Sequence, residues 1–353
     1  MRAWVLHDIK NFTFEEADKP AFDNSEVLVK VKAAGICGSD IPRVFETGAH
    51  VKPLIIGHEF SGQVVESGEE DSAWLGKRVG IFPLIPCGKC VPCQKNLYEM
   101  CRNYSYLGSR CNGGFAEYVS VPKWNLIELP ENVSFEQAAM LEPMAVAVHA
   151  MRKGFSLMKE AEKKDANVAV CGLGTIGLLL VMFLRQAGVK NIFVIGNKES
   201  QRKHLHALGI DSNNYCDCRQ EDAKEFLMDK TDGCGVDLFF ECVGKNETIT
   251  QGVETVTPGG SMVLVGNPYS DMSFDKNTYW KILRNQIRVT GTWNSSFTGD
   301  ANDDWHYVLS CLGNGQIAPE KLITHKLKLE ELMDGLLIMR DKLEDYIKVM
   351  VTI

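Results

Sequence analysis

The chain has 353 residues, 45% hydrophobic and 24% charged, so it is long enough for two domains with apolar cores. Its formal net charge of −8 argues against nucleic acid or an anionic membrane as the main partner. The longest apolar run, Ile176 to Leu184, is far shorter than the ~20 residues of a membrane span. No secretion signal is evident at the N-terminus, so the 12 cysteines predict a reducing, cytoplasmic compartment and metal ligation rather than disulfides.

Residues 1–145 are predicted to form a mostly-β domain. Short β-type runs, separated by Gly, Pro and Asn, lie at 27–31, 62–66, 78–82 and 115–121. The segment 135–154 has apolar residues at the three- and four-residue spacing of a helix, with Gly154 at its end. This helix is expected to lead into the second domain.

Four cysteines within this first domain have the spacing C-x2-C-x2-C-x7-C. They are Cys87, Cys90, Cys93 and Cys101. Thiolates at this spacing predict a closed tetrahedral zinc site that leaves no coordination position for a substrate. A pair of disulfides or an iron–sulfur cluster is the alternative. A closed zinc site is expected to contribute to stability or assembly rather than to chemistry.

A second set of metal-binding residue types lies outside this cluster. Cys37 offers a thiolate with the Ser39 hydroxyl nearby, and His58 and Glu59 offer an imidazole and a carboxylate. Glu142 lies at an otherwise apolar helix start, where a carboxylate without a partner would be costly to bury. Taken singly, His58 could be a core histidine and Glu142 a helix N-terminal charge. Together they predict a second zinc with an open position.

A β-α-β alternation follows, which predicts a parallel sheet with crossover helices. The strand 167–171 leads into a helix that ends near Ala187, and Gly172, Gly174 and Gly177 form a G-x-G-x-x-G motif between them. These glycines allow a tight turn, close approach of a pyrophosphate and helix–strand packing. The alternative is that they serve packing only. A dinucleotide beside an open zinc predicts alcohol oxidation by hydride transfer.

The end of the next strand predicts which dinucleotide binds. An NAD site normally has Asp or Glu there to hold the ribose 2′-hydroxyl, but this chain has Gly196. The small residue leaves room for a 2′-phosphate, which Lys198 and Arg202 could neutralise and Tyr215 could contact. The alternative is a solvated helix start, and we favour NADP. The expected cofactor contacts are Gly172, Gly174, Thr175, Ile176, Gly177, Gly196, Asn197, Lys198, Arg202, Tyr215, Val243 and Gly266.

These motifs resemble the zinc-dependent medium-chain alcohol/sorbitol dehydrogenase superfamily over essentially the whole chain. The segment 57–62, with Gly68, matches the zinc signature of that family. The segments most similar to its galactitol-1-phosphate 5-dehydrogenase branch are 37–43, 47–50, 107–110 and 281–284. The resemblance implies a GroES-like catalytic domain over 1–145 and 289–353, a doubly wound Rossmann domain over 146–288, and a homodimer or homotetramer.

The resemblance also implies roles for single residues. The family's zinc ligands correspond to Cys37, His58 and Glu142. Glu59 corresponds to a carboxylate that binds the metal directly or through water. Ser39 matches the hydroxyl that passes the substrate proton outward, and Asp40 matches the residue that orients the ligand histidine. Pro42 stands where many relatives have a relay histidine, so the proton needs another exit.

The implied substrate is a polyol or a polyol phosphate. Cationic candidates for a phosphate are Arg43, His50, Arg110 and Arg284, unless they are ordinary surface charges. Gly196 departs from the galactitol-phosphate branch, which has an aspartate there, and resembles NADP-dependent secondary alcohol dehydrogenases instead. A simple secondary alcohol is therefore the alternative substrate. A non-catalytic or quinone-reductase-like NADP-binding protein is a further alternative, which the retained zinc ligands and Ser39 disfavour.

Overall fold

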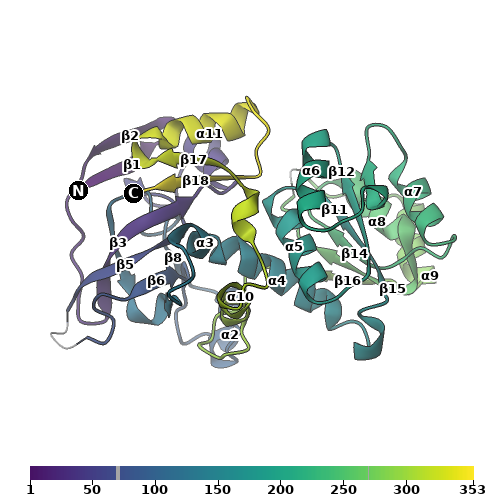
Figure 1. Ribbon diagram of the computed structural model, residues 1–353, viewed down its shortest axis with the longest axis horizontal. Helices are drawn as coiled ribbons and strands as arrows, with labels where there is room; N and C mark the ends of the chain where they lie inside the picture. Colours follow the sequence, from purple (N-terminus) through teal and green to yellow (C-terminus); the bar gives the residue numbers. More distant parts are fainter. Residues whose placement is uncertain (69–71, 269) are drawn as a thin grey trace. The chain divides into compact units, whose positions relative to one another are not determined.

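The computed structural model of the chain (Figure 1) describes residues 1–68, 72–268 and 270–353. It divides into two compact units, which we call the β unit (Met1–Pro143 with Ser296–Ile353) and the parallel-sheet unit (Met144–Ser295). The second boundary falls after the expected position 288. The reason is that β16 (Arg288–Gly291) pairs with a neighbouring strand of the parallel sheet and so belongs to that unit.

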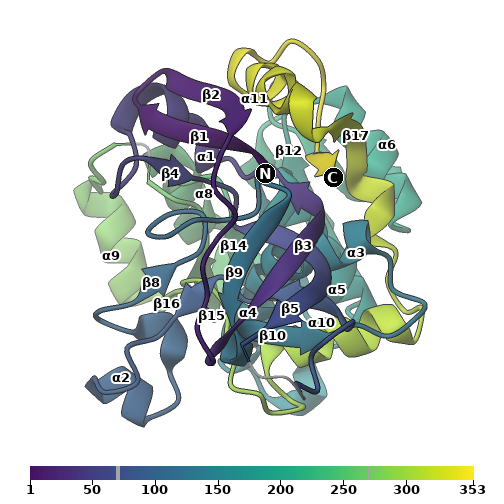
Figure 2. The same cartoon turned by 90° about the vertical axis from the view of Figure 1, so that its left-hand side faces the viewer.

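A seven-stranded sheet organises the β unit, with the order β10-β6-β5-β3-β18-β17 and with β9 paired to β3. Its strands are β3 (Glu26–Gly35), β5 (Glu59–Ser67), β6 (Arg78–Ile81), β9 (Tyr118–Pro122), β10 (Leu126–Glu128), β17 (Ile323–Lys328) and β18 (Lys348–Thr352). The C-terminal strand β18 runs antiparallel beside β3, with Met350 opposite Gly35. Figure 2 shows β3 and the C-terminus within this unit. Residues from the two ends of the chain therefore meet in one sheet.

Smaller elements complete the β unit. They are β1 (Arg2–Asp8), β2 (Asn11–Glu16), β4 (Leu54–Ile55), β7 (Leu84–Ile85), β8 (Ser105–Tyr106), α1 (Asp40–Pro42), α2 (Val91–Gln94), α10 (Asp304–Gly313) and α11 (Leu332–Asp341). Val27, Val29 and Val31 alternate along β3, so they share one face of the sheet. Leu332 and Leu336 of α11 lie in the same buried cluster.

Two helices stand where the sequence predicts one at 135–154. They are α3 (Phe135–Ala139) and α4 (Leu141–Phe155). Pro143 has no N–H group, so it cannot donate to the carbonyl of Ala139, and the helical hydrogen-bond ladder is interrupted there. A proline is tolerated in the first turn of a helix, where its missing donor would have no partner. The break places Glu142 in the first turn of α4.

The parallel-sheet unit holds a six-stranded sheet with the order β13-β12-β11-β14-β15-β16. The strands before β16 are β11 (Asn167–Cys171), β12 (Asn191–Gly196), β13 (Tyr215–Asp217), β14 (Val236–Glu241) and β15 (Val256–Leu264). Its helices are α5 (Thr175–Gln186), α6 (Glu199–Ala207), α7 (Ala223–Lys230), α8 (Asn246–Thr255) and α9 (Lys276–Arg284). Every described strand pair is parallel, and the strand order reverses between β11 and β14. The predicted doubly wound α/β fold is confirmed.

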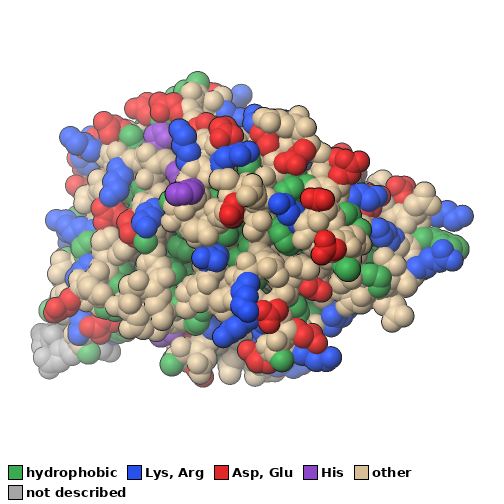
Figure 3. Space-filling model, turned by 45° about the vertical axis from the view of Figure 1, so that its right-hand side comes forward, with side chains coloured by type: hydrophobic (Ala, Val, Ile, Leu, Met, Phe, Trp, Pro, Cys, Tyr) green, Lys and Arg blue, Asp and Glu red, His purple; other side chains and the backbone are tan. Residues whose placement is uncertain are grey.

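The charge distribution on the surface and the length of the helices indicate whether nucleic acid or a membrane could be a partner. On the face shown in Figure 3, acidic and basic side chains are interspersed, without a broad area of one sign among the described residues. Such mixing offers no continuous basic stripe for a phosphate backbone on that face. Among the described parts of the chain, no helix combines the length and the apolar composition that a bilayer crossing requires.

Candidate metal centres and dinucleotide-binding loop

The four clustered cysteines converge on one point in the loop between β7 and β8, with all four sulfurs within 4.8 Å of one another. The Sγ–Sγ distances are 3.4 Å for Cys90–Cys93, 3.9 Å for Cys90–Cys101 and 4.0 Å for Cys87–Cys93. A tetrahedral zinc with Zn–S bonds of about 2.3 Å requires separations of about 3.8 Å. Backbone N–H groups of Arg102 and Cys93 lower the pKa of Cys90 to about 6, which favours the thiolate that zinc binds. The loop could therefore hold a structural zinc.

Cys37, His58 and Glu59 form a second group, in which one ligand atom of each lies within 4.8 Å of the others. The sheet brings them together, because β3 and β5 are antiparallel and Gly35 lies opposite Glu59. The residues after β3 and those at the start of β5 therefore lie at the same end of the sheet. His58 and Glu59 are buried, with 6% and 2% of their surface exposed. A thiolate, an imidazole and a carboxylate in one buried place are donors suited to zinc.

Glu142 faces this group from the first turn of α4. It is 8% exposed, and the Tyr106 hydroxyl donates to its Oε1 atom at 3.2 Å. The Tyr106 ring packs edge-on against the His58 ring, with 5.8 Å between the centroids. Among the described residues, the tightest ligand group does not include Glu142. The site thus offers two carboxylates, Glu59 within that group and Glu142 beside it.

A buried lysine from the C-terminal strand holds Glu59. The Lys348 ammonium is 2% exposed, donates to Glu59 Oε2 and also donates to the Ile36 carbonyl at 2.9 Å. Gly35 provides the space, because a Cβ atom there would lie 2.4 Å from Glu59 Oε2 and 2.6 Å from Lys348 Cε. A buried carboxylate needs such a partner, since an unpaired buried charge is strongly destabilising.

Asp40 anchors the loop that carries Cys37. Its Oδ2 accepts the Cys37 N–H at 3.0 Å, its Oδ1 accepts from Arg43 at 2.8 Å, and His58 Nδ1 lies 3.8 Å from Oδ1. The His58 Nδ1 atom is buried and has no hydrogen-bond partner. Ser39 donates to Cys37 Sγ at 3.4 Å. Asp40 is placed to orient the loop and the imidazole, while the Ser39 hydroxyl lies directly beside the thiol.

The ionisable groups at this site shift one another's pKa values. Burial raises the pKa of Glu142 to about 7, although the nearby His58 opposes the shift. Burial alone would lower the pKa of His58, but Cys37, Asp40 and Glu142 raise it to about 10. Burial and the charge of Glu142 also raise the pKa of Tyr106. Several anionic groups thus share one buried place, which is the electrostatic setting that a bound cation would relieve.

The glycine motif has the backbone of a phosphate-binding turn in the parallel-sheet unit. Gly172 has φ of +97°, a conformation that favours glycine. A Cβ atom at Gly177 would lie 1.9 Å from the Gly172 carbonyl oxygen, so this position requires glycine for close packing. A Cβ atom at Gly174 would meet nothing within 4 Å, and this residue is the N-cap of α5. Open space at a helix N-terminus suits a diphosphate.

Two later segments lie beside this turn at the carboxyl ends of the strands. Val243 Cγ2 would lie 2.6 Å from a Cβ atom at Gly172, and Gly266 packs against the backbone of Val243 and Gly244. The buried Glu241 carboxylate accepts the N–H groups of Val243 and Gly244, each at 2.8 Å from Oε1. Dinucleotides bind outside the carboxyl ends of parallel strands, at the point where strand order reverses.

The end of β12 is more crowded than the sequence indicates. A Cβ atom at Gly196 would lie 2.3 Å from Gln201 Oε1 and 2.9 Å from both Leu173 and Tyr215. Gln201 Oε1 accepts the Asn197 N–H at 3.0 Å. Gln201 Nε2 donates to the Leu173 carbonyl at 3.1 Å. The Gln201 amide therefore fills the place that a carboxylate at position 196 would need.

The groups expected to contact a 2′-phosphate lie around this amide. Tyr215 is 3% exposed, and its hydroxyl donates to the Lys198 carbonyl at 2.9 Å, so it supports the strand end rather than facing solvent. The Arg202 guanidinium lies 5.0 Å above the Tyr215 ring and 3.4 Å from Glu199. Arg202 and Lys198 are partly exposed and remain the candidates for an anionic ligand.

Comparison with known proteins places this geometry in a family. Residues 23–131 match the model of the alcohol dehydrogenase GroES-like domain, and residues 175–316 match that of zinc-binding dehydrogenases. Galactitol 1-phosphate 5-dehydrogenase of Escherichia coli K12 is 34% identical over 312 residues, which is 86% of each chain. The chain belongs to the zinc-dependent medium-chain alcohol and polyol dehydrogenases.

Solved structures agree with this assignment. The crystal structure of galactitol-1-phosphate dehydrogenase from Escherichia coli has a TM-score of 0.89 and 30% identity, with 100% of each chain covered. A zinc-binding dehydrogenase from Sinorhizobium meliloti, bound to NADP, has a TM-score of 0.88 and 28% identity, with 100% of this chain and 99% of that chain covered. The predicted resemblance to this family is therefore confirmed.

The residues of this dehydrogenase that were predicted to bind a phosphate differ in their partners and in their exposure. Arg43 is paired with Asp40 and lies 3.4 Å from the Ser109 hydroxyl, so its guanidinium already has partners. Arg110 is exposed and stacks over Tyr104, 4.6 Å from the ring centroid. His50 is also exposed. Arg284 belongs to the other unit, where it stacks over Trp280 at the end of α9, 5.0 Å from the ring centroid.

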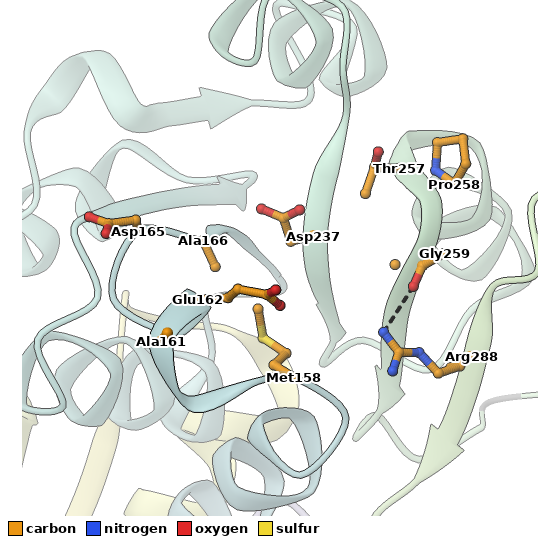
Figure 4. Close-up of a pocket in the computed structure, with 11 residues that line it drawn as sticks. Met158, Ala161, Glu162, Asp165, Ala166, Asp237, Thr257, Pro258, Gly259 and Arg288 are labelled. Atoms are coloured by element: carbon orange, nitrogen blue, oxygen red, sulfur yellow. Dashed lines mark hydrogen bonds between the residues drawn. The ribbon is translucent and has the colours of Figure 1, made fainter.

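A cavity of about 430 Å³ in the dehydrogenase lies at the opposite, amino end of the parallel strands (Figure 4). Three carboxylates line it, and each has a partner: Asp237 accepts the Asn167 N–H at 2.8 Å, Asp165 pairs with Lys190 at 2.6 Å, and Glu162 pairs with Lys159 at 3.2 Å. Arg288 donates to the Gly259 carbonyl at 2.9 Å. These contacts tie loops together, and dinucleotides bind at the other edge of such sheets.

Sequence reasoning missed three residues of these sites: Tyr106, Gln201 and Lys348. A lysine within the hydrophobic strand Lys348–Thr352 was a usable signal, because buried lysines are almost always paired. Tyr106 and Gln201 carry no comparable signal, since a tyrosine in a short strand and a glutamine in a polar helix are ordinary.

Proposed function

We propose that this dehydrogenase transfers a hydride between NADP(H) and a secondary alcohol of a polyol or polyol phosphate, giving the ketose. The supporting observation is the buried group of Cys37, His58 and Glu59, with Glu142 beside it. Two zincs per chain are proposed, one at this group and one at the cysteine cluster. The test is a metal determination combined with an activity screen, in which one zinc per chain and no turnover would refute the proposal.

The residues of the site divide the chemistry between them. When bound, zinc at Cys37, His58 and a carboxylate would supply a Lewis acid that favours loss of the substrate hydroxyl proton. The Ser39 hydroxyl, beside the thiol, accepts that proton and passes it to water, because Pro42 offers no side-chain acceptor. A bound nicotinamide would accept the hydride from the carbon that bears this hydroxyl, so alcohol oxidation would release one proton. Asp40 keeps the Cys37 loop and His58 in place.

The proposed preference for NADP rests on Gly196, Lys198 and Arg202. No carboxylate stands at the end of β12, and two partly exposed cations lie close by. The structurally similar protein from Sinorhizobium meliloti is bound to NADP, which supports the same choice. A higher kcat/KM with NAD than with NADP would contradict it.

A phosphorylated polyol is the proposed substrate class, and the relative named galactitol 1-phosphate 5-dehydrogenase supports it. Arg110 and His50 are the exposed candidates for the phosphate in the β unit, since Arg43 is paired with Asp40. The screen compares galactitol 1-phosphate, arabitol phosphates, sorbitol and 2-butanol with both cofactors. Good turnover of 2-butanol with failure on every polyol would favour the simple secondary alcohol instead. Arg110→Ala should raise KM for a phosphorylated substrate more than for its unphosphorylated analogue.

We also propose that the chain forms a homo-oligomer through the edge of its parallel sheet. Strand β16 is the last strand in the described order, so one side of its backbone can pair with a second copy. Between 43% and 58% of the surface is exposed for six apolar residues of α9, β16 and the adjoining segments: Phe274, Tyr279, Trp280, Leu283, Val289 and Trp293. A Trp280→Ser/Val289→Lys variant should shift the mass from light scattering to that of a monomer. Leu343→Lys, at a 65% exposed site elsewhere, is the matched control.

A cytoplasmic location is proposed on the basis of cysteine chemistry. All 12 cysteines are free thiols, including those of both candidate metal sites. A reducing compartment keeps such thiols available to zinc. Fractionation of the native host cell with antibodies to the chain would test this, and recovery outside the cytoplasm would contradict it.

A further inference from the structure

Tyr106 contacts two of the expected ligands of the open metal site, His58 and Glu142, without being an expected ligand itself. Its hydroxyl donates to Glu142 Oε1 at 3.2 Å, and its ring packs edge-on against His58. A phenol that donates to one oxygen of a carboxylate leaves the other oxygen available to a cation. The contact therefore orients the Glu142 carboxylate and leaves Oε2 outside this hydrogen bond.

Close backbone packing places Tyr106 beside His58 and Glu142. Cβ atoms at Gly108 and Gly113 would lie 2.3 Å and 2.2 Å from the Gly57 carbonyl oxygen, so only glycines allow this loop to lie against the segment that carries His58. Gly108 also has φ of +78°. The Tyr106 carbonyl accepts N–H groups from the following turn, including that of Arg110 at 2.8 Å. These contacts therefore fix the backbone from which the Tyr106 ring reaches His58 and Glu142.

The two carboxylates of the site are held in different ways. Glu59 Oε2 is paired with the buried Lys348 ammonium, whereas Glu142 receives a hydrogen bond from a neutral phenol. A cation competes with the metal for carboxylate charge, while a neutral donor orients the group and leaves its charge to the metal. Glu142 is thus the carboxylate better prepared to bind a metal.

We propose that Tyr106 is a positioning residue for the catalytic metal, which presents Glu142 as a ligand through the hydrogen bond to Oε1. This inference rests on the proposed function, since it assumes that the open site binds zinc. It adds a residue whose effect is exerted through Glu142 rather than on the substrate.

The test measures metal binding rather than turnover. Tyr106→Phe keeps the ring against His58 and removes only the hydroxyl. The zinc of the open site should be lost to a chelator at about 10- to 100-fold lower competitor concentration, whereas the zinc of the cysteine cluster should be retained. Co²⁺ substituted at the open site should show a shifted visible absorption. Tyr104→Phe is the matched control, because its ring packs on Tyr106 with 6.2 Å between centroids.

A double variant distinguishes an effect of Tyr106 on the position of Glu142 from a general loss of structure. In a Glu142→Ala background, Tyr106→Phe should have no further effect on zinc retention, since the acceptor of the hydrogen bond is already absent. Unchanged zinc affinity and Co²⁺ absorption in Tyr106→Phe would overturn the inference and leave the proposed function intact. A wild-type chain that binds only one zinc would refute the proposed function itself.

A direct measurement covers the case in which Tyr106→Phe does not fold. A crystal structure of the zinc-loaded wild-type protein should show the Tyr106 oxygen within hydrogen-bond distance of Glu142, with the other Glu142 oxygen turned to the metal. A Tyr106 hydroxyl turned away from Glu142 in that structure would overturn the inference.

Discussion

The two candidate metal sites of the β unit differ in how much of the chain is needed to build them. The cysteine cluster comes from one loop, and its first and last ligands are only 14 positions apart. At the open site, Lys348 meets Glu59 across 289 positions and Tyr106 meets Glu142 across 36. A local site is fixed by spacing within one loop, whereas a dispersed site depends on sheet register and on the packing of several elements.

The same contrast separates the expected purposes of the two sites. Four thiolates would close the coordination sphere of a zinc at the cysteine site, so the metal would brace a loop and leave no position for a substrate. The open site has surplus carboxylates and a hydroxyl beside its thiol, which suit chemistry. Substitutions at the two sites should therefore fail in different ways.

The largest effect is expected at the open site. Cys37→Ser should lower kcat/KM by about 1,000-fold, because a Lewis acid contributes several kcal/mol and each 1.36 kcal/mol is tenfold. Zinc content should fall by one ion per chain. Steady-state kinetics and elemental analysis check these two points. Activity within tenfold of the wild type would mean that Cys37 is not a ligand of the working metal.

Lys348→Met should cost about 3–5 kcal/mol of stability, because it leaves Glu59 as an unpaired buried charge. Urea unfolding measures the loss. The double variant Lys348→Met/Glu59→Gln is the matched control and should recover a large part of it, since neither member of the pair then carries a charge. A single variant as stable as the wild type would show that Glu59 has another partner in solution.

Cys93→Ser should act on stability more than on chemistry. Loss of a zinc held at 100 times its Kd removes about 2.7 kcal/mol, which corresponds to about 5–11 °C in thermal midpoint for a unit of this size. The kcat of the protein that remains folded should change little. A loss of kcat as large as that of Cys37→Ser, with no change in thermal midpoint, would contradict a purely stabilising role for the cysteine site.

The smallest expected effect concerns cofactor choice and extends the comparison to the dinucleotide site. Gly196→Asp alone should shift preference toward NAD only weakly, because Gln201 Oε1 occupies the space beside position 196. Gly196→Asp/Gln201→Ala should raise the ratio of kcat/KM for NAD over NADP by about tenfold or more, the scale of a hydrogen bond to a charged group. A double variant with the ratio of the single variant would mean that Gln201 does not control access.

The sequence by itself determined the features that depend on local spacing. Three patterns each predict a structure formed within a few tens of residues. They are the cysteine intervals, the glycine motif after a buried strand and the β-α-β alternation. The zinc signature around His58 likewise identified the family, which the comparisons confirmed.

Only the tertiary structure decided which partners these residues have. The register of β3 against β5 and β18 brings Lys348 to Glu59, and the interruption of the helix at Pro143 sets Glu142 opposite Tyr106. Arg43 turns to Asp40, and Gln201 fills the space beside Gly196. Such contacts join segments that are far apart in the chain. Which of several polar partners a side chain contacts depends on tertiary packing, which a local sequence pattern does not predict.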